Sequence, residues 1–212
     1  TFEVALLTKP RSGNVVIDLT SADPAEVTVS PASVTFGSGN WSTSQVITLT
    51  GQPDSSADGD QTVSITASVN DPATADTVYQ GLADQNFNVT VTNIDSAGYT
   101  VAETGGSTSV SETLTTDTFT VVLGTQPTGN VVFDVSSSDT GEASVSSSTL
   151  TFTTGDWSSA QTITITGVND NIDDGDQFST ITVSVNGSTV DATYTALDNQ
   201  TVNVTTTDND TA

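Results

Sequence analysis

The sequence of 212 residues has no cysteine, histidine or methionine, and its only basic residues are Lys9 and Arg11. Without cysteine there can be no disulfide bond and no thiolate metal site. Without histidine there can be no Ser-His-Asp or Cys-His mechanism and no imidazole ligand. Two cations cannot form the basic patch that nucleic acids or an anionic membrane surface require. The sequence therefore argues strongly against nucleic-acid binding and excludes catalysis by a Ser-His-Asp or Cys-His mechanism.

Long apolar runs are missing as well, so direct insertion into a membrane is not expected. No signal-peptide pattern is visible, and the missing initiator methionine predicts that Thr1 lies inside a longer natural chain. Carboxylate pairs could still hydrolyse glycosides, but nothing in the sequence marks a substrate cleft. We therefore expect a protein that is not an enzyme.

Negative charge is what the chain has in excess, since 26 acidic residues give a formal net charge of -24. High charge is also a feature of disordered chains. Regular alternation argues against disorder here, because apolar residues take every second position in Gln161–Thr166 and again at Phe119, Val121 and Leu123. This period of two predicts half-buried strands and an all-β fold class.

The second half of the chain repeats the first half. Gly13–Asp18 corresponds to Gly129–Asp134, and Asp58–Gln61 corresponds to Asp174–Gln177. The offset of about 116 residues is the length of a domain rather than of a solenoid unit. We expect two tandem domains, residues 1–96 and residues 97–212.

Turn residues divide each copy into short strand-like segments, and this spacing predicts two tandem immunoglobulin-like Greek-key β-sandwiches. The second copy is complete, with strands expected at Tyr99–Val110 (kinked at Gly105–Gly106), Asp117–Leu123, Asn130–Ser136, Ser144–Phe152 (interrupted), Ala160–Thr166, Gln177–Asn186 and Gln200–Thr206. The first copy lacks the first of these, and its strands are expected at Thr1–Leu7, Asn14–Thr20, Thr28–Phe36, Gln45–Thr50, Gln61–Val69 and Asn86–Thr92. Either a longer array has been cut, or another molecule supplies the strand to the open sheet edge.

Strand parity places most acidic loops of the second copy at one end of its sandwich. Carboxylates gathered in this way repel one another unless a cation binds. Ca²⁺ accepts six to eight oxygen ligands in flexible geometry, which suits loops better than the strict octahedron of Mg²⁺. The alternative is a solvated acidic surface without metal. The predicted ligands are Glu112, Asp139, Asp170, Asp173, Asp174, Asp176, Asp208 and Asp210.

The first copy has a sparser acidic set at the same positions. Asn93 replaces its first terminal aspartate, and the acidic residue of its first loop is missing together with the strand. Glu103, near the junction between the copies, is a further candidate that could reach the first copy. The candidates of the first copy are Asp23, Asp54, Asp58, Asp60 and Asp95.

The acidic motifs resemble those of the Calx-beta group of calcium-binding β-sandwich modules. The resemblance covers the second copy and most of the first, and it rests on Val110-Ser111-Glu112, on Val168-Asn169-Asp170 with the acids to Asp176, and on Asp208-Asn209-Asp210. The segment Asp139-Thr140-Gly141-Glu142 departs from the group because it has no aromatic acidic motif. The resemblance implies Ca²⁺ as the bound ion and Glu112 as a ligand from the first loop.

These observations predict a structural, calcium-binding repeat of an extracellular, cell-surface, adhesin-like or matrix protein. Calcium would stiffen the loops and the junction, and the partners would be neighbouring repeats or other copies of the chain. Three alternatives stay open: a filament subunit joined by strand addition, a regulatory calcium sensor, and a carbohydrate-binding module that uses Trp41 or Trp157. The paired tryptophans are also explained by packing on the two cores.

Overall fold

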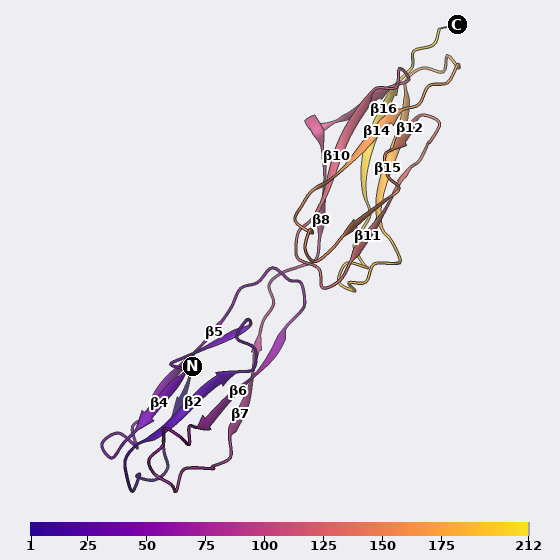
Figure 1. Ribbon diagram of the computed structural model, residues 1–212. Helices are drawn as coiled ribbons and strands as arrows, with labels where there is room; N and C mark the ends of the chain where they lie inside the picture. Colours follow the sequence, from indigo (N-terminus) through magenta and orange to yellow (C-terminus); the bar gives the residue numbers. More distant parts are fainter. Residues whose placement is uncertain (212) are drawn as a thin grey trace. The chain divides into compact units, whose positions relative to one another are not determined.

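The computed structural model describes residues 1–211 and confirms the all-β prediction. The chain separates into two compact units (Figure 1). Unit 1 comprises Thr1–Asp54 and Gly59–Asn93, and unit 2 comprises Ser55–Asp58 and the chain from Ile94 onward. No helix within residues 1–211 is long and apolar enough to cross a membrane.

Unit 2 contains two β-sheets. The first has the order β12-β14-β10-β8, made of Ala143–Val145, Gln161–Gly167, Thr116–Leu123 and Tyr99–Glu103. The second has the order β13-β11-β15-β16-β9, made of Thr149–Phe152, Val131–Ser137, Gln177–Val185, Gln200–Thr207 and Thr108–Ser111. The interrupted segment predicted at 144–152 therefore contributes one strand to each sheet.

The first strand of unit 2 also changes sheet, at the kink predicted from its two glycines. β8 lies antiparallel to β10, whereas β9 lies parallel to β16. Between them the turn η1 (Thr104–Gly106) holds Gly105 at φ 78° and Gly106 at φ 83°. Glycine adopts positive φ without the steric cost that a side chain brings. The segment β8–η1–β9 therefore closes one edge of the sandwich across both sheets.

The inward-facing residues of unit 2 form one continuous core. Its largest fully buried side chains include Phe119, Phe133, Phe152 and Tyr194, each 0% exposed. The ring of Tyr99 packs on that of Phe133, with 4.5 Å between the ring centroids. This core joins β8 at the closing edge to the strands of both sheets.

Unit 1 has the same arrangement without the closing segment. Its sheets have the orders β1-β5-β3 and β4-β2-β6-β7, so β1 and β7 are edge strands. In unit 2 the counterparts of β1 and β7 are β10 and β16, and each of these has an outer neighbour, β8 or β9. This confirms that the first copy lacks its N-terminal strand. The strands are β1 (Phe2–Val4), β2 (Val15–Ser21), β3 (Val27–Ser30), β4 (Ser33–Phe36), β5 (Gln45–Gly51), β6 (Gln61–Val69) and β7 (Gln85–Val91).

The missing segment shortens β1 and divides the core of unit 1. The sequence predicts a strand over residues 1–7, but β1 ends at Val4 because it pairs only with β5. The buried residues then form two separate clusters, one that includes Phe36 and Ile47 and another that includes Val63 and Ile65. Phe2 and Val29, which are only partly buried, pack against both clusters.

One loop of unit 2, at the end away from the acidic loops, is held by the buried carboxylate of Asp191. The side chain is 3% exposed. Its Oδ2 accepts hydrogen bonds from the backbone N (2.6 Å) and Oγ1 (2.9 Å) of Thr128, and its Oδ1 accepts from N (2.8 Å) and Oγ1 (2.6 Å) of Thr193. Burial raises the pKa of Asp191, but these hydrogen bonds outweigh it and hold the pKa below its ordinary value of 3.8.

Replacing Asp191 with asparagine should destabilise unit 2 by about 2 kcal/mol at neutral pH, because hydrogen bonds to a charged group are lost. A lowered pKa in the folded state stabilises the fold above the ordinary value of 3.8 and ceases to do so as pH falls through the folded pKa. The difference between wild type and Asp191→Asn should therefore shrink below about pH 4. Denaturant unfolding from pH 7 to pH 3 measures it, and a difference that stays constant over that range would contradict this account.

Candidate metal centre

Strand directions bring the acidic loops of unit 2 to the same end of the sandwich. Ser111, at the end of β9, is in register with Thr207 at the end of β16. Ala143, at the start of β12, is in register with Gly167 at the end of β14. The residues that follow β9, β14 and β16, and those that precede β12, therefore meet at this end.

Three acidic side chains from separate loops converge there. Glu112, Glu142 and Asp170 each offer a carboxylate oxygen, and these oxygens lie within 4.8 Å of one another. Glu112 is 2% exposed and Glu142 is 8% exposed, while Asp170 is half-buried. Carboxylates are seldom buried in this way unless they are paired or coordinate a metal.

A second group shares Glu112. The carboxylate oxygens of Glu112, Asp208 and Asp210 also lie within 4.8 Å of one another. The backbone of the terminal segment orients this group, because the N–H of Asp210 donates to Oδ1 of Asp208 at 2.7 Å and the N–H of Gly175 donates to its Oδ2 at 2.8 Å. Glu112 therefore connects the two groups.

The electrostatic environment of Glu112 is set by opposing effects. A hydrogen bond from the N–H of Asn209 (3.2 Å) lowers the pKa of Glu112, whereas burial and the charges of Asp208, Asp170 and Asp210 raise it. The net direction is upward. For Asp208 the hydrogen bonds from Asp210 and other backbone groups dominate, and its pKa is lowered.

The environment of Glu142 is less favourable for a negative charge than that of Glu112, which accepts a backbone hydrogen bond. Burial raises its pKa first, and the carboxylates of Asp174, Asp139, Glu112 and Asp170 raise it further. All the charges named here are negative, and the only basic residues of the chain, at positions 9 and 11, belong to unit 1. Unit 2 therefore has no basic side chain of its own to neutralise this group.

Two buried oxygens of the cluster have no protein partner. Within residues 1–211, Oε2 of Glu142 and Oδ2 of Asp210 are buried and accept no hydrogen bond. A buried oxygen of this kind costs free energy unless a cation, a proton or a water molecule compensates it. These oxygens and the residues converging on them offer a cation only oxygen ligands, the set that hard divalent ions accept.

The remaining predicted ligands of unit 2 lie in the same loops, outside the two groups. Asp139 is exposed, and its Oδ1 accepts from the N–H of Gly141 at 2.9 Å. Asp176 is exposed and accepts from the N–H of Asp208 at 3.3 Å. Asp173 and Asp174 are exposed in the loop between β14 and β15.

Glu103 ends β8, and its Oε2 accepts a hydrogen bond from Oγ1 of Thr108 at 2.9 Å. It belongs to neither group of converging carboxylates within residues 1–211. Its predicted contribution to the first copy stays a prediction.

The candidates of the first copy are divided between the units, so we describe no common site for them. Asp23, Asp54 and Asp60 belong to unit 1, whereas Asp58 and Asp95 are grouped with unit 2. Two of them, Asp23 and Asp60, form hydrogen bonds that correspond to those of Asp139 and Asp176 in unit 2. Asp23 accepts from the N–H of Ala25 at 3.0 Å, and Asp60 accepts from the N–H of Asn93 at 3.0 Å.

Glu142 is the functional candidate that the sequence reasoning missed. It lies three positions after Asp139, and the first copy repeats this spacing with Glu26 after Asp23. The backbone role is shared too, since the carbonyl of Glu142 accepts from Val168 N and that of Glu26 accepts from Gln52 N, both at 2.8 Å. The repeated Asp-x-x-Glu spacing was the signal that could have identified it.

The two tryptophans pack against the cores of their own units. Trp41 lies against the cluster of unit 1 and Trp157 against that of unit 2, each partly buried. Their carbonyl groups accept hydrogen bonds from Leu6 N and Leu123 N. Packing accounts for their repetition, and a carbohydrate platform stays an untested alternative.

Comparisons with known proteins leave the function to be argued from these residues. No family model and no curated protein matches the chain. Among solved structures it is similar to domains 4 and 5 of the S-layer protein SbsC, at 20% identity and a TM-score of 0.40 over 90% of this chain and 70% of that chain. It is also similar to domains 1–6 of the surface layer protein SbsC, at 20% identity and a TM-score of 0.40 over 91% of this chain and 20% of that chain. A third similarity is to SSP-19, an MSP-domain-like protein of Caenorhabditis elegans, at 15% identity and a TM-score of 0.34 over 50% of this chain and 97% of that chain. None of these similarities is close enough to carry an argument about function.

Proposed function

We propose that unit 2 is a structural module that binds Ca²⁺ at its acidic end. The observation that carries this proposal is the buried, unpartnered Oε2 of Glu142, beside carboxylate oxygens of Glu112 and Asp170. Exposed acidic loops are common without a metal, but a buried carboxylate among others of the same charge costs free energy that a bound cation would offset. Glu112, Glu142 and Asp170 would hold one ion, and Glu112 would also contribute to a second group with Asp208 and Asp210.

Calcium fits this set better than the other common ions. The candidate ligands are all oxygens, which excludes the softer metals that prefer sulfur or imidazole. They come from several loops rather than from one rigid element, and Ca²⁺ accepts such flexible geometry whereas Mg²⁺ requires a near-ideal octahedron. Loops of this kind bind calcium at roughly 0.1–1 mM in extracellular modules. With an affinity in that range the site would be filled outside the cell or on its surface, which is the location we propose.

Binding would join loops that belong to both sheets. Glu142 precedes β12 of the first sheet, Glu112 follows β9 of the second sheet, and Asp208 follows β16 of the second sheet. Ions held by the two groups that share Glu112 would restrain these loops and stabilise the fold, because they bind the native state and not the unfolded chain. We infer a structural role as a spacer module of a surface, adhesin-like or matrix protein, with no catalytic activity.

Thermal unfolding of the chain with and without calcium tests this function. At a calcium concentration one hundred times the Kd, the stabilisation is about 2.7 kcal/mol. For a domain of this size the unfolding temperature of unit 2 should then rise by roughly 10 °C, and excess EDTA should reverse the rise. The same concentration of Mg²⁺ at equal ionic strength is the matched control and should produce less than half of the shift. A melting curve that calcium and EDTA leave unchanged would rule the function out.

A further inference from the structure

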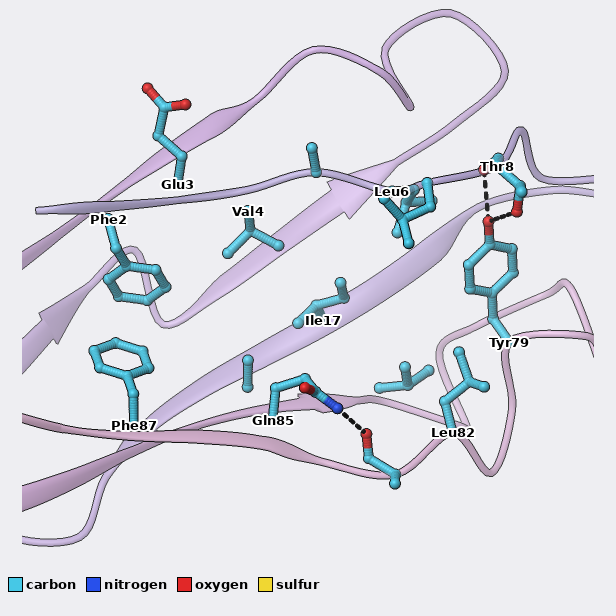
Figure 2. A pocket seen from close by; sticks show the side chains of 15 residues that line it. Phe2, Glu3, Val4, Leu6, Thr8, Ile17, Tyr79, Leu82, Gln85 and Phe87 are labelled. Carbon is cyan, nitrogen blue, oxygen red and sulfur yellow. Dashed lines mark hydrogen bonds between the residues drawn. The ribbon is translucent and has the colours of Figure 1, made fainter.

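Unit 1 contains an apolar groove where its closing strand is missing. The groove has a volume of about 810 Å³ and runs between β1 and the sheet of β2, β6 and β7. Phe2, Val4 and Ile17 line it together with Phe87, whose ring packs edge-on to Phe2 with 4.8 Å between the centroids (Figure 2). Phe87 is 37% exposed, whereas its counterpart in unit 2, Val202, is 1% exposed.

Unit 2 shows what fills the corresponding position. There the ring of Tyr99, from β8, packs on Phe133, which is the counterpart of Ile17. The hydroxyl of Tyr99 donates to the carbonyl oxygen of Val183 at 3.0 Å, and the counterpart of Val183 is Ala67, another residue of the groove. The groove of unit 1 therefore has the shape and chemistry that receive an aromatic residue of an extended strand.

A glutamine of unit 2 forms hydrogen bonds with the backbone of β8, and unit 1 has a glutamine at the same position. In unit 2 the side-chain amide of Gln200 donates to the carbonyl oxygen of Tyr99 at 2.6 Å, and its Oε1 accepts from the N–H of Val101 at 3.3 Å. Gln85, its counterpart, lies in the groove of unit 1 (Figure 2). Its amide turns back to donate to the carbonyl oxygens of Ala83 and Asp84. The same side chain is therefore present without the strand that it pairs with in unit 2.

A glycine marks where the other half of the strand would pass. A Cβ at Gly167 of unit 2 would lie 2.2 Å from the carbonyl oxygen of Ser111, the last residue of β9. The counterpart in unit 1 is also a glycine, Gly51, but there a Cβ would meet only Cγ1 of Val91, at 3.8 Å. Nothing in unit 1 alone requires glycine at position 51, whereas a bound strand would require it.

We propose that unit 1 is a strand acceptor whose ligand is an extended polypeptide segment with the chemistry of Tyr99–Ser111. The segment would place an aromatic residue in the groove and pair antiparallel with β1. It would then pass from one sheet to the other at a pair of glycines and pair parallel with β7. Within residues 1–211, the segment Tyr99–Ser111 is already paired with the strands of unit 2, so it is not free to fill the groove of unit 1. The ligand is therefore a further segment of this chemistry, and the proposal is independent of metal binding.

Titration of the 212-residue chain with a peptide of the sequence Tyr99–Thr115 tests the proposal. Two-dimensional amide NMR should show perturbations at Phe2, Ile17 and Phe87, and the unfolding temperature of unit 1 should rise with peptide concentration. Alanine in place of the tyrosine of the peptide should weaken binding at least tenfold, because the anchoring ring is lost. A scrambled peptide of the same composition is the control and should leave these resonances unchanged.

The variant Gly51→Ala distinguishes specific binding of a strand from nonspecific binding to an apolar surface. This variant should unfold at the same temperature as the free wild-type chain, yet its affinity for the peptide should fall at least tenfold, because the new methyl group meets the peptide backbone. Gln85→Ala is the second variant and should weaken binding severalfold without unfolding unit 1. If Gly51→Ala unfolds unit 1, the Gln85 variant and the alanine peptide still decide the question.

Other results overturn the proposal. Binding that is equal for the scrambled peptide, or unaffected by Gly51→Ala in a folded variant, would mean a nonspecific apolar surface. Dimers of the peptide-free chain that protect Phe2 and Phe87 would mean that a second copy occupies the groove. Perturbations confined to unit 2 would mean exchange with its own strand rather than acceptance by unit 1.

Discussion

Replacing Gly167 with alanine should destabilise unit 2 by about 3 kcal/mol, the upper end of the cost of inserting one methyl group into a packed site. A Cβ at this position would lie 2.2 Å from the carbonyl oxygen of Ser111, 2.7 Å from its carbonyl carbon and 3.1 Å from its nitrogen. These atoms belong to the backbone, so no change of rotamer can relieve the clash. The chain from β9 to Glu112 would have to move, and the unfolding temperature of unit 2 should fall by roughly 10–20 °C.

The tandem repeat supplies a matched control for this substitution. Gly51→Ala places the same methyl group at the end of β5, the counterpart of β14, where the nearest atom is a flexible side-chain methyl 3.8 Å away. Its effect on unit 1 should stay within about 0.5 kcal/mol. Calorimetry of both variants, with each transition assigned to a unit, measures the contrast. Equal destabilisation by the two substitutions would show that the cost comes from the strand end itself and not from the segment packed over it.

The local sequence pattern predicts most of the fold because strand formation follows alternation and turn residues. The expected strand at 117–123 is observed as β10, Thr116–Leu123, and the one at 177–186 as β15, Gln177–Val185. The change of sheet between β12 and β13 is not visible in that pattern, because it depends on which neighbours accept the hydrogen bonds. The length of β1 likewise depends on its neighbours. It pairs only with β5, and its own residues do not show that an outer partner is absent.

The candidate site was predicted only in part, for a related reason. Alternating strand directions place the acidic loops at one end whatever the loop conformations are. Which carboxylates turn inward depends on those conformations, and here Asp139 accepts a hydrogen bond from the backbone of its own turn while Glu142 is buried. A count of charges along the sequence gives both residues equal weight. Comparison of the copies pairs both residues with acids of the first copy, Asp23 and Glu26, so repetition marks both positions without showing which carboxylate turns inward.

Replacing Glu142 with glutamine should change the stability of unit 2 in opposite directions without and with calcium. Without calcium, the substitution removes one negative charge from a buried group in which burial and neighbouring carboxylates raise the pKa of Glu142. The variant should therefore unfold at a higher temperature than wild type in EDTA. With calcium, the variant lacks an anionic ligand, and a hundredfold loss of affinity removes about 2.7 kcal/mol of stabilisation. The wild type should then be the more stable protein, so the two curves of unfolding temperature against calcium concentration should cross.

Asp198→Asn is the control that separates local compensation from net charge. It removes the same charge from unit 2, but Asp198 is exposed and precedes β16, whereas the acidic residues Asp208 and Asp210 follow that strand. Its curve should run parallel to that of wild type at every calcium concentration. If the curve of Glu142→Gln were also parallel, the buried carboxylate would act only through general electrostatic repulsion and not as a ligand. A crossing confined to Glu142→Gln, and absent from the equal change of charge at Asp198, would mean that the effect depends on a carboxylate at the ion and not on the net charge of unit 2.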